Sequence, residues 1–382
     1  MAEQMKAHEY LEELRKQGDK SAEYFDTLYT QLDRKARAKG IPLNGQFELT
    51  PLCNFDCRMC YTHLTKEQMR GKSLLTVAQW KQIIDEAYAA GLVRVNLTGG
   101  ECLTYPGFEE LYLYLHSLGC EIRVLTNGAL LDERWVRFFR DHPPIMIQIS
   151  LYGGDEETYE RVTGQRMFST VSGNIRRVID AGLPVTLALT PSKYMGEGML
   201  GTVRAAHGFG IPFSMAPHLQ DPYESTGRSG VNHELTPDEY VELFRYRNRL
   251  NGAEDLSIDP ERLPPPGGPR HDRGRCGLNC GGGLSCFNIS WDGTMSLCTE
   301  SRDVATKPLE DGFSACWKKI HEIAANWPCP PECLECPYES VCTNCEILKA
   351  EIAGEPGKQP LALCERTRYL VQNGVYTIPA CE

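Results

Sequence analysis

Seventeen cysteines constrain this chain of 382 residues more than any other feature, because most of them gather in two groups. Few lie in the first half beyond residue 60, and none lies between Cys120 and Cys276. The chain begins with the polar segment MAEQMKAHEY, which lacks the apolar core of a signal peptide. An odd number of cysteines without an export signal does not fit a disulfide scaffold. Buried apolar cysteines would not cluster in this way, so the spacing indicates metal binding.

Composition limits the classes of partner. The formal net charge is −11, which argues against a protein that mainly grips nucleic-acid phosphates. No apolar run is long enough to span a bilayer. We therefore expect a cytoplasmic protein that binds neither nucleic acid nor membrane.

Short apolar strands alternate with helices from about residue 44 to residue 225, which predicts a parallel sheet with helices outside it. Six repeats are too few for a closed barrel, so the α/β fold class expected is a partial (β/α)6 TIM-like barrel. Its functional groups should lie at the C-terminal ends of the strands. The expected strands are 45–50, 93–98, 120–126, 145–153, 184–190 and 212–218, and the expected helices between them are 76–91, 107–119, 132–142, 171–184 and 198–210.

Three segments flank or follow the predicted barrel. Residues 1–43 form an N-terminal extension, with an amphipathic helix expected at 20–38. Residues 226–275 hold one more helix, at 236–250, and a proline- and glycine-rich linker. Residues 276–382 are rich in cysteine and form a separate predicted domain.

The first cysteine group follows the first predicted strand directly. Cys53, Cys57 and Cys60 have the spacing Cys-x3-Cys-x2-Cys. Three thiolates can hold three irons of a [4Fe–4S] cubane and leave the fourth iron open. A zinc site is the alternative, with His63 as the local fourth ligand.

This spacing after the first strand of a strand–helix series resembles the radical S-adenosylmethionine (SAM) superfamily, over roughly residues 44–220. The resemblance implies that the open iron binds SAM and that reductive cleavage yields a 5′-deoxyadenosyl radical, which abstracts hydrogen from the substrate. It also implies SAM contacts at the ends of successive strands. Alone, each of these residues would be read as a turn former, a solvated side chain or a surface ion pair. Gly99 and Gly100 would let the backbone approach a ligand closely, and Glu101 is assigned to the SAM amino group. Asn127 and Ser150 are assigned to the ribose or carboxylate, and Arg161 to the carboxylate.

The second cysteine group resembles the SPASM domain, an extension of radical SAM enzymes that carries two auxiliary [4Fe–4S] clusters. Zinc knuckles are the alternative for its central run, CLECPYESVCTNC. One departure puts Cys345 in doubt: two residues separate it from Cys342 where the family has three, and Cys276 is the substitute. The resemblance assigns Cys280, Cys286, Cys298 and Cys345 to the first auxiliary cluster, and Cys333, Cys336, Cys342 and Cys364 to the second.

Two further residues are candidates for catalysis. Cys102 follows the Gly-Gly-Glu segment and is either a hydrogen-atom donor or an inert buried cysteine. In some SPASM sulfatase-maturing enzymes, an Asp that acts as a base directly follows the third ligand of the first auxiliary cluster. Here Thr299 stands in that place and Glu300 is next, which weakens a sulfatase-maturase function and leaves Glu300 as a candidate.

Three functions fit these features. The first is oxidative modification of a ribosomally made peptide by cross-linking, epimerisation or residue oxidation, with three [4Fe–4S] clusters, SAM and an electron donor such as flavodoxin or ferredoxin. The second is a radical dehydrogenase or epimerase of a sugar or alcohol. The third, a non-catalytic electron carrier, needs no open-iron cysteine triplet. Only about forty residues precede the barrel, so we expect no leader-binding domain of the kind many peptide maturases carry.

Overall fold

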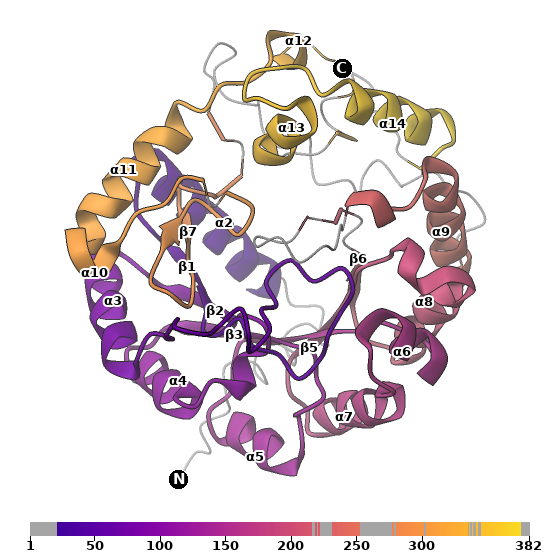
Figure 1. The fold of residues 1–382 in the computed structure, drawn as a ribbon, viewed down its shortest axis with the longest axis horizontal. Coiled ribbons are helices and arrows are strands. Elements are labelled where there is room, and N and C mark those ends of the chain that lie inside the picture. Colours follow the sequence, from indigo (N-terminus) through magenta and orange to yellow (C-terminus); the bar gives the residue numbers. More distant parts are fainter. Residues whose placement is uncertain are drawn as a thin grey trace.

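The computed structural model describes residues 21–215, 218–219, 221, 231–252, 277–278, 280–301, 303–334, 336, 338, 341–342 and 345–375. Its centre is one eight-stranded sheet with the order β6-β5-β4-β3-β2-β1-β7-β8. The sheet curves into a partial barrel, and helices surround it (Figure 1). The predicted α/β partial barrel is confirmed.

The six predicted strands are present, parallel and in chain order. They are β1 (Asn44–Glu48), β2 (Arg94–Thr98), β3 (Glu121–Thr126), β4 (Met146–Ser150), β5 (Val185–Leu189) and β6 (Phe213–Met215). The helices along them are α3 (Val77–Ala90), α4 (Phe108–Ser117), α5 (Glu133–Asp141), α6 (Glu156–Thr163), α7 (Phe168–Asp180), α8 (Met199–Gly208) and α9 (Pro237–Leu250), with the short 3-10 helices η1 (Cys102–Thr104), η2 (Lys193–Gly198) and η3 (Val231–His233). Helix α6 was not predicted. It is short, and it is set by local caps: Asp155 accepts from Thr158 N, and Gly164 ends the helix at φ 72°.

Alternation along each strand divides the sheet into an outer apolar face and an inner polar face. Val95 and Leu97 of β2 are fully buried, whereas Asn96 between them is only half-buried. Phe47 of β1 packs on Trp80 of α3, with ring centroids 5.3 Å apart. The apolar face therefore meets the helices, and the polar residues of the same strands point into the barrel.

A C-terminal hairpin extends the barrel sheet. Strand β7 (Cys286–Ile289) pairs in parallel with β1, and β8 (Met295–Ser296) returns antiparallel to β7. The predicted strand–turn–strand around Asp292-Gly293 is thus confirmed, but it continues the barrel instead of standing apart from it. Without β7, strand β1 would leave an open edge of unpaired backbone groups.

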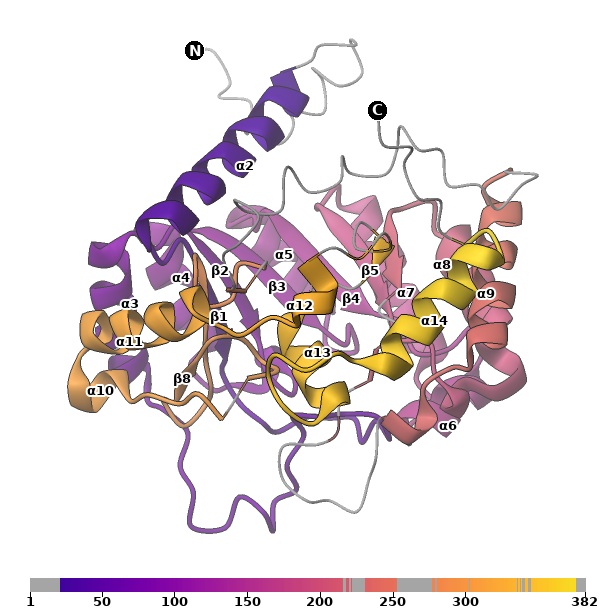
Figure 2. The ribbon, with the colours of Figure 1, turned by 90° about the horizontal axis from the view of Figure 1, so that it is seen from above.

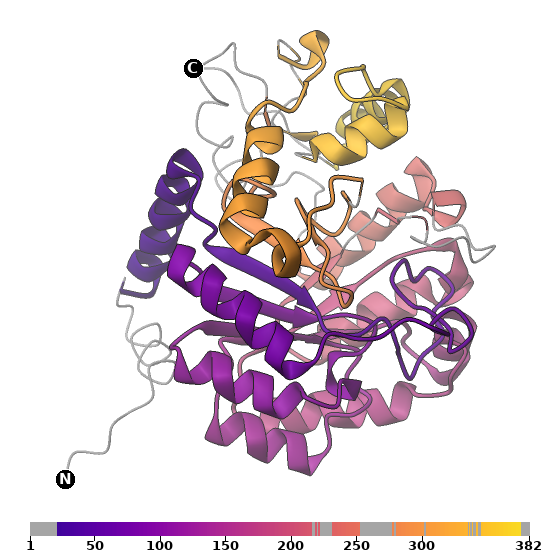
Figure 3. The ribbon, with the colours of Figure 1, turned by 60° about the vertical axis from the view of Figure 1, so that its left-hand side comes forward.

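The remaining C-terminal elements complete the ring of helices. They are α10 (Pro308–Asp311), α11 (Phe313–Ala325), α12 (Pro331–Leu334), α13 (Glu346–Ala353) and α14 (Leu361–Gln372). Helix α11 packs on α3, and α14 packs on α9 (Figures 1 and 3). C-terminal elements therefore lie along both ends of the series of barrel helices, from α3 to α9. The predicted linker, DPERLPPPGGPR at 259–270, lies outside the described residues.

Helix α2 (Ser21–Lys39) lies at the end of the barrel where β1 begins (Figure 2). Its Tyr29 hydroxyl donates to Asn44 Oδ1, and the Arg94 guanidinium lies 3.6 Å from the centre of the Tyr29 ring. The predicted helix at 20–38 is present over the described residues and ends at Lys39. Among the described residues, no helix combines the length and the apolar character needed to cross a bilayer.

Candidate active site

The loop after β1 carries the first cysteine group and is anchored at several places. Glu101 N donates to Leu52 O at 3.0 Å, which ties the loop to the end of β2. Further along, Asp56 N and Arg58 N donate to carbonyls at the end of α6, at 3.0 and 2.9 Å. The loop is therefore held from both sides at the C-terminal end of the barrel.

Steric contacts with the cysteine loop explain why glycines stand at the two positions before Glu101. A Cβ on Gly99 would lie 2.4 Å from Thr50 O, and one on Gly100 would lie 2.4 Å from Leu52 O. Gly99 also has φ 139°, which disfavours any side chain. These glycines let the cysteine loop pass directly over the end of β2, whereas the sequence suggested close approach of a ligand.

The thiols of Cys53, Cys57 and Cys60 lie close enough to influence one another's ionisation. Burial raises the pKa of Cys53 to about 12 and that of Cys57 well above its usual range, and the neighbouring thiolates add to both shifts. Backbone N–H groups of the same loop point at two of the sulfurs: Phe55 N lies 3.3 Å from Cys53 Sγ, and His63 N lies 3.3 Å from Cys60 Sγ. Three neighbouring thiols on one loop, two of them facing backbone donors, suit a cluster held by three thiolates.

His63, the fourth ligand that a zinc site would need, has another partner. Its Nδ1 lies 3.2 Å from Asp56 Oδ1. That contact holds the imidazole against the loop.

Glu101 is the most heavily bonded of the predicted SAM-binding residues. Its carboxylate is fully buried and accepts hydrogen bonds from Asn127 N (2.8 Å), Leu103 N (3.1 Å) and Thr126 Oγ1 (2.8 and 2.9 Å). Burial raises its pKa, and these hydrogen bonds oppose the shift. Glu101 therefore joins the ends of β2 and β3, a structural role that the sequence did not suggest.

The other predicted SAM-binding residues lie at the same end of the barrel. Asn127 Nδ2 donates to Asn54 Oδ1 at 2.7 Å and lies 3.5 Å from Cys53 Sγ, so it touches the cysteine loop itself. Ser150 ends β4. Arg161 of α6 donates from Nη2 to Thr158 Oγ1 at 3.3 Å, and its buried Nε has no partner among the described residues. An anion such as a carboxylate would satisfy that N–H.

The two catalytic candidates differ in exposure. Cys102 is fully buried, donates to Leu125 O at 3.3 Å, and has a pKa raised well above its usual range by burial. Glu300 is exposed, and its Oε2 accepts from Cys345 Sγ at 3.3 Å. Tyr61, which the sequence did not single out, hydrogen-bonds Thr299 beside Glu300, so it joins the first cysteine loop to the second group.

The first auxiliary ligand set gathers around a glycine turn. A Cβ on Gly281 would lie 2.5 Å from Cys286 Sγ, and one on Gly282 would lie 3.5 Å from Cys280 Sγ. Electrostatic interactions link Cys280 to both Cys298 and Cys345. The alternative ligand Cys276 lies outside the described residues, so the choice between it and Cys345 stays a prediction.

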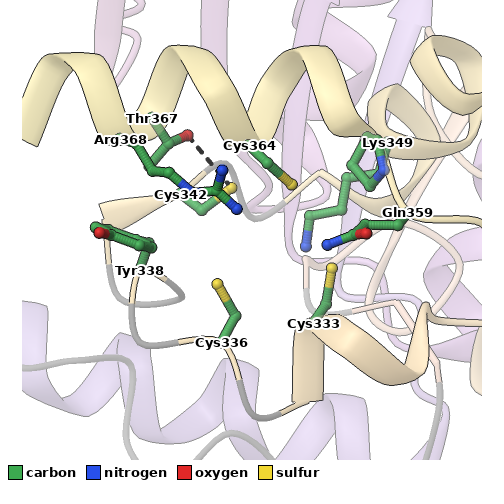
Figure 4. A pocket seen from close by; sticks show the side chains of 10 residues that line it. Cys333, Cys336, Tyr338, Cys342, Lys349, Gln359, Cys364, Thr367 and Arg368 are labelled. Carbon is green, nitrogen blue, oxygen red and sulfur yellow. Dashed lines mark hydrogen bonds between the residues drawn. The ribbon is translucent and has the colours of Figure 1, made fainter.

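The second auxiliary ligand set lines one pocket (Figure 4). Cys333, Cys336, Cys342 and Cys364 all face it. The ammonium of Lys349 also reaches this pocket and pairs with Glu346 at 2.7 Å, both side chains being almost fully buried. Sequence reasoning missed this ion pair, because neighbouring charges on a helix are usually solvated.

Residues 47–196 match the sequence profile of the radical SAM superfamily. The chain therefore carries a radical SAM domain, as the cysteine spacing predicted, and such a domain holds a [4Fe–4S] cluster and SAM.

Comparison with curated proteins gives relatives of two kinds. The sporulation killing factor maturation protein SkfB of Bacillus subtilis (strain 168) is 29% identical over 196 residues, which cover 49% of this chain and 45% of SkfB. The AdoMet-dependent heme synthase of Methanosarcina barkeri is 24% identical over 333 residues, which cover 81% of this chain and 92% of that protein. The chain thus spans less than half of SkfB.

Among solved structures, Streptococcus suis SuiB bound to S-adenosylmethionine has a similar fold. It aligns with a TM-score of 0.66 at 17% identity, over 89% of this chain and 82% of SuiB. SuiB has also been solved bound to its precursor peptide SuiA.

Proposed function

We propose that this protein cleaves SAM reductively and uses the resulting radical to oxidise a ribosomally made peptide. The observation that carries the proposal is the match of residues 47–196, which include Cys53, Cys57 and Cys60, to the radical SAM superfamily, with Asn127 Nδ2 lying 3.5 Å from Cys53 Sγ. The bound cluster would supply the electron that cleaves SAM. The chain's own residues would hold the cluster and orient SAM, with Arg161 offering its buried N–H to the SAM carboxylate.

We further propose that the two C-terminal thiol sets hold auxiliary [4Fe–4S] clusters, giving three per chain. A peptide that loses one hydrogen atom to the 5′-deoxyadenosyl radical must then lose a proton and an electron to become a stable oxidised product. An auxiliary cluster would accept the electron. Exposed Glu300 lies beside Cys345 and is the candidate acceptor of the proton. A flavodoxin or ferredoxin would supply the reducing electron.

Support for a peptide substrate comes from the relatives. SkfB is named a maturation protein, and SuiB binds a precursor peptide. The observation favouring the second candidate, a small-molecule substrate, is that the heme synthase matches the larger share of this chain.

Short peptides encoded beside the gene test the proposal, offered to the reconstituted enzyme in parallel with sugars, cyclitols and iron-free porphyrins. The proposal expects SAM consumption coupled to a loss of two hydrogens from a peptide. Turnover restricted to the small molecules would overturn it.

A further inference from the structure

Four polar residues lie side by side across neighbouring strands of the barrel. Gln46 of β1 is in register with Asn96 of β2 on one side and with Asn288 of β7 on the other. Asn96 is in turn in register with Arg123 of β3. The residues next to them in each strand are buried against the helices, so these four side chains point to the inner face of the sheet. We call Arg123, Asn96, Gln46 and Asn288 the polar row.

Several polar atoms of this row are buried without a hydrogen bond. Asn288 is 1% exposed, and neither its Oδ1 nor its Nδ2 has a partner among the described residues. The same holds, within that part of the chain, for Asn96 Oδ1 and Arg123 Nε. A buried polar group without a partner destabilises the fold, and native proteins keep few of them. The row therefore presents donors and acceptors suited to a ligand that carries both.

Arg123 gives one end of the row a positive charge, which interacts electrostatically with Arg94, Tyr29 and Glu121. The adjacent carboxylate, Glu121, is bonded by Arg94 at 2.5 Å. Arg94 also lies over the ring of Tyr29, which holds it at the base of the barrel. An acidic group of a ligand would complement the Arg123 guanidinium.

The length of the row distinguishes an extended chain from a single sugar. Neighbouring strands are about 4.8 Å apart, so four strands place Arg123 and Asn288 roughly 14 Å apart, about the length of four extended residues. The row lies two residues before the ends of β1 and β2, roughly 7 Å below the edge where the cysteine loop begins. It also includes Asn288, two residues after Cys286.

We infer that the polar row binds the main chain of an extended substrate peptide, with an acidic group of that peptide at Arg123. Carboxamides suit this role because each offers one acceptor and one donor group, which match the N–H and C=O of a peptide unit. The inference rests on the proposed function and names where its substrate lies. The row is a binding and specificity element, and the groups that react with the substrate lie above it.

Two asparagines form a matched pair for the test. Asn174 is also buried, at 7% exposed against 1% for Asn288, but its polar atoms are bonded. Its Nδ2 donates to Gly128 O at 2.9 Å and to Ala129 O at 3.1 Å, and its Oδ1 accepts from Arg177 Nη1. Thermal unfolding of the reconstituted holoenzymes is measured for Asn288→Leu and Asn174→Leu. We expect the midpoint to rise for Asn288→Leu and to fall for Asn174→Leu, because only the second replacement breaks hydrogen bonds. A fall for Asn288→Leu equal to that of Asn174→Leu would mean a structural role and overturn the inference.

The second measurement uses a library of acetylated, amidated hexapeptides, with and without one aspartate. For a peptide that the wild type modifies, Asn288→Leu should raise KM by about tenfold. Arg123→Gln should raise KM only for the peptides that contain aspartate. An unchanged KM in both variants would overturn the inference and leave the proposed function standing. A wild type that modifies no peptide, here or among the gene-encoded ones, would overturn both.

Discussion

Replacing Glu101 by glutamine tests whether its carboxylate holds the site together. Each of its oxygens accepts one backbone N–H, that of Leu103 or that of Asn127, and both share the Thr126 hydroxyl. Glutamine turns one oxygen into an NH2 group that faces donors. One backbone N–H then loses its acceptor in a site without solvent, at a cost of about 1–3 kcal/mol. Glu101→Ala leaves both N–H groups unpaired and costs roughly 2–6 kcal/mol by the same reasoning.

The raised pKa of Glu101 indicates an effect that reduces the loss of stability in Glu101→Gln. It shows that burial penalises the charged carboxylate, so neutral glutamine recovers part of the loss. We therefore expect Glu101→Gln to lie at the low end of its range and Glu101→Ala clearly beyond it.

The assay is denaturant unfolding of the reconstituted enzyme without SAM. Glu110→Gln serves as the control, because Glu110 is exposed and pairs with Lys81 at the surface. A residue that merely contacts SAM would leave unfolding without SAM unchanged. Free energies of unfolding for both Glu101 variants within about 0.5 kcal/mol of the wild type would refute the reasoning.

Three further predictions concern the C-terminal clusters. Anaerobic reconstitution should load about twelve irons per chain, and a value near four, or zinc in their place, would contradict the auxiliary clusters. Lys349→Met should shift the reduction potential of the second auxiliary cluster to more negative values, because a buried positive charge favours the reduced state. Redox titration followed by EPR measures the potential, and Lys358→Met, at an exposed position, is the control that should not shift it. Asp292 accepts hydrogen bonds from Thr294 N (3.0 Å) and from the Ser290 hydroxyl (2.8 Å) in the turn between Cys286 and Cys298. Asp292→Ala removes this acceptor, so the iron content should fall toward about eight per chain. Full iron loading would show that the turn does not position those ligands.

Local patterns carried most of what could be predicted. Short apolar strands alternate with helices, and Gly91 and Asp132 mark helix ends, so the strand–helix series could be read directly from the sequence. The spacing of Cys53, Cys57 and Cys60 likewise predicted a radical SAM domain, and the family match confirms it.

Pairing between distant segments could not be predicted. That Cys286 lies opposite Asn44, 242 residues earlier, depends on which sheet edge the hairpin joins, and no local pattern encodes this. The polar row depends on the same register. The buried Lys349–Glu346 pair could not be predicted either, because its burial comes from the packing of α13 and α14 around the pocket.

The measurement that tests the central claim most directly is 5′-deoxyadenosine production by a variant with Cys53, Cys57 and Cys60 all replaced by alanine. The purified protein is reconstituted with iron and sulfide, and SAM and a strong reductant are added. We predict that 5′-deoxyadenosine is abolished, while the visible absorption and about eight irons of the auxiliary clusters persist. Undiminished 5′-deoxyadenosine in this variant would contradict the account.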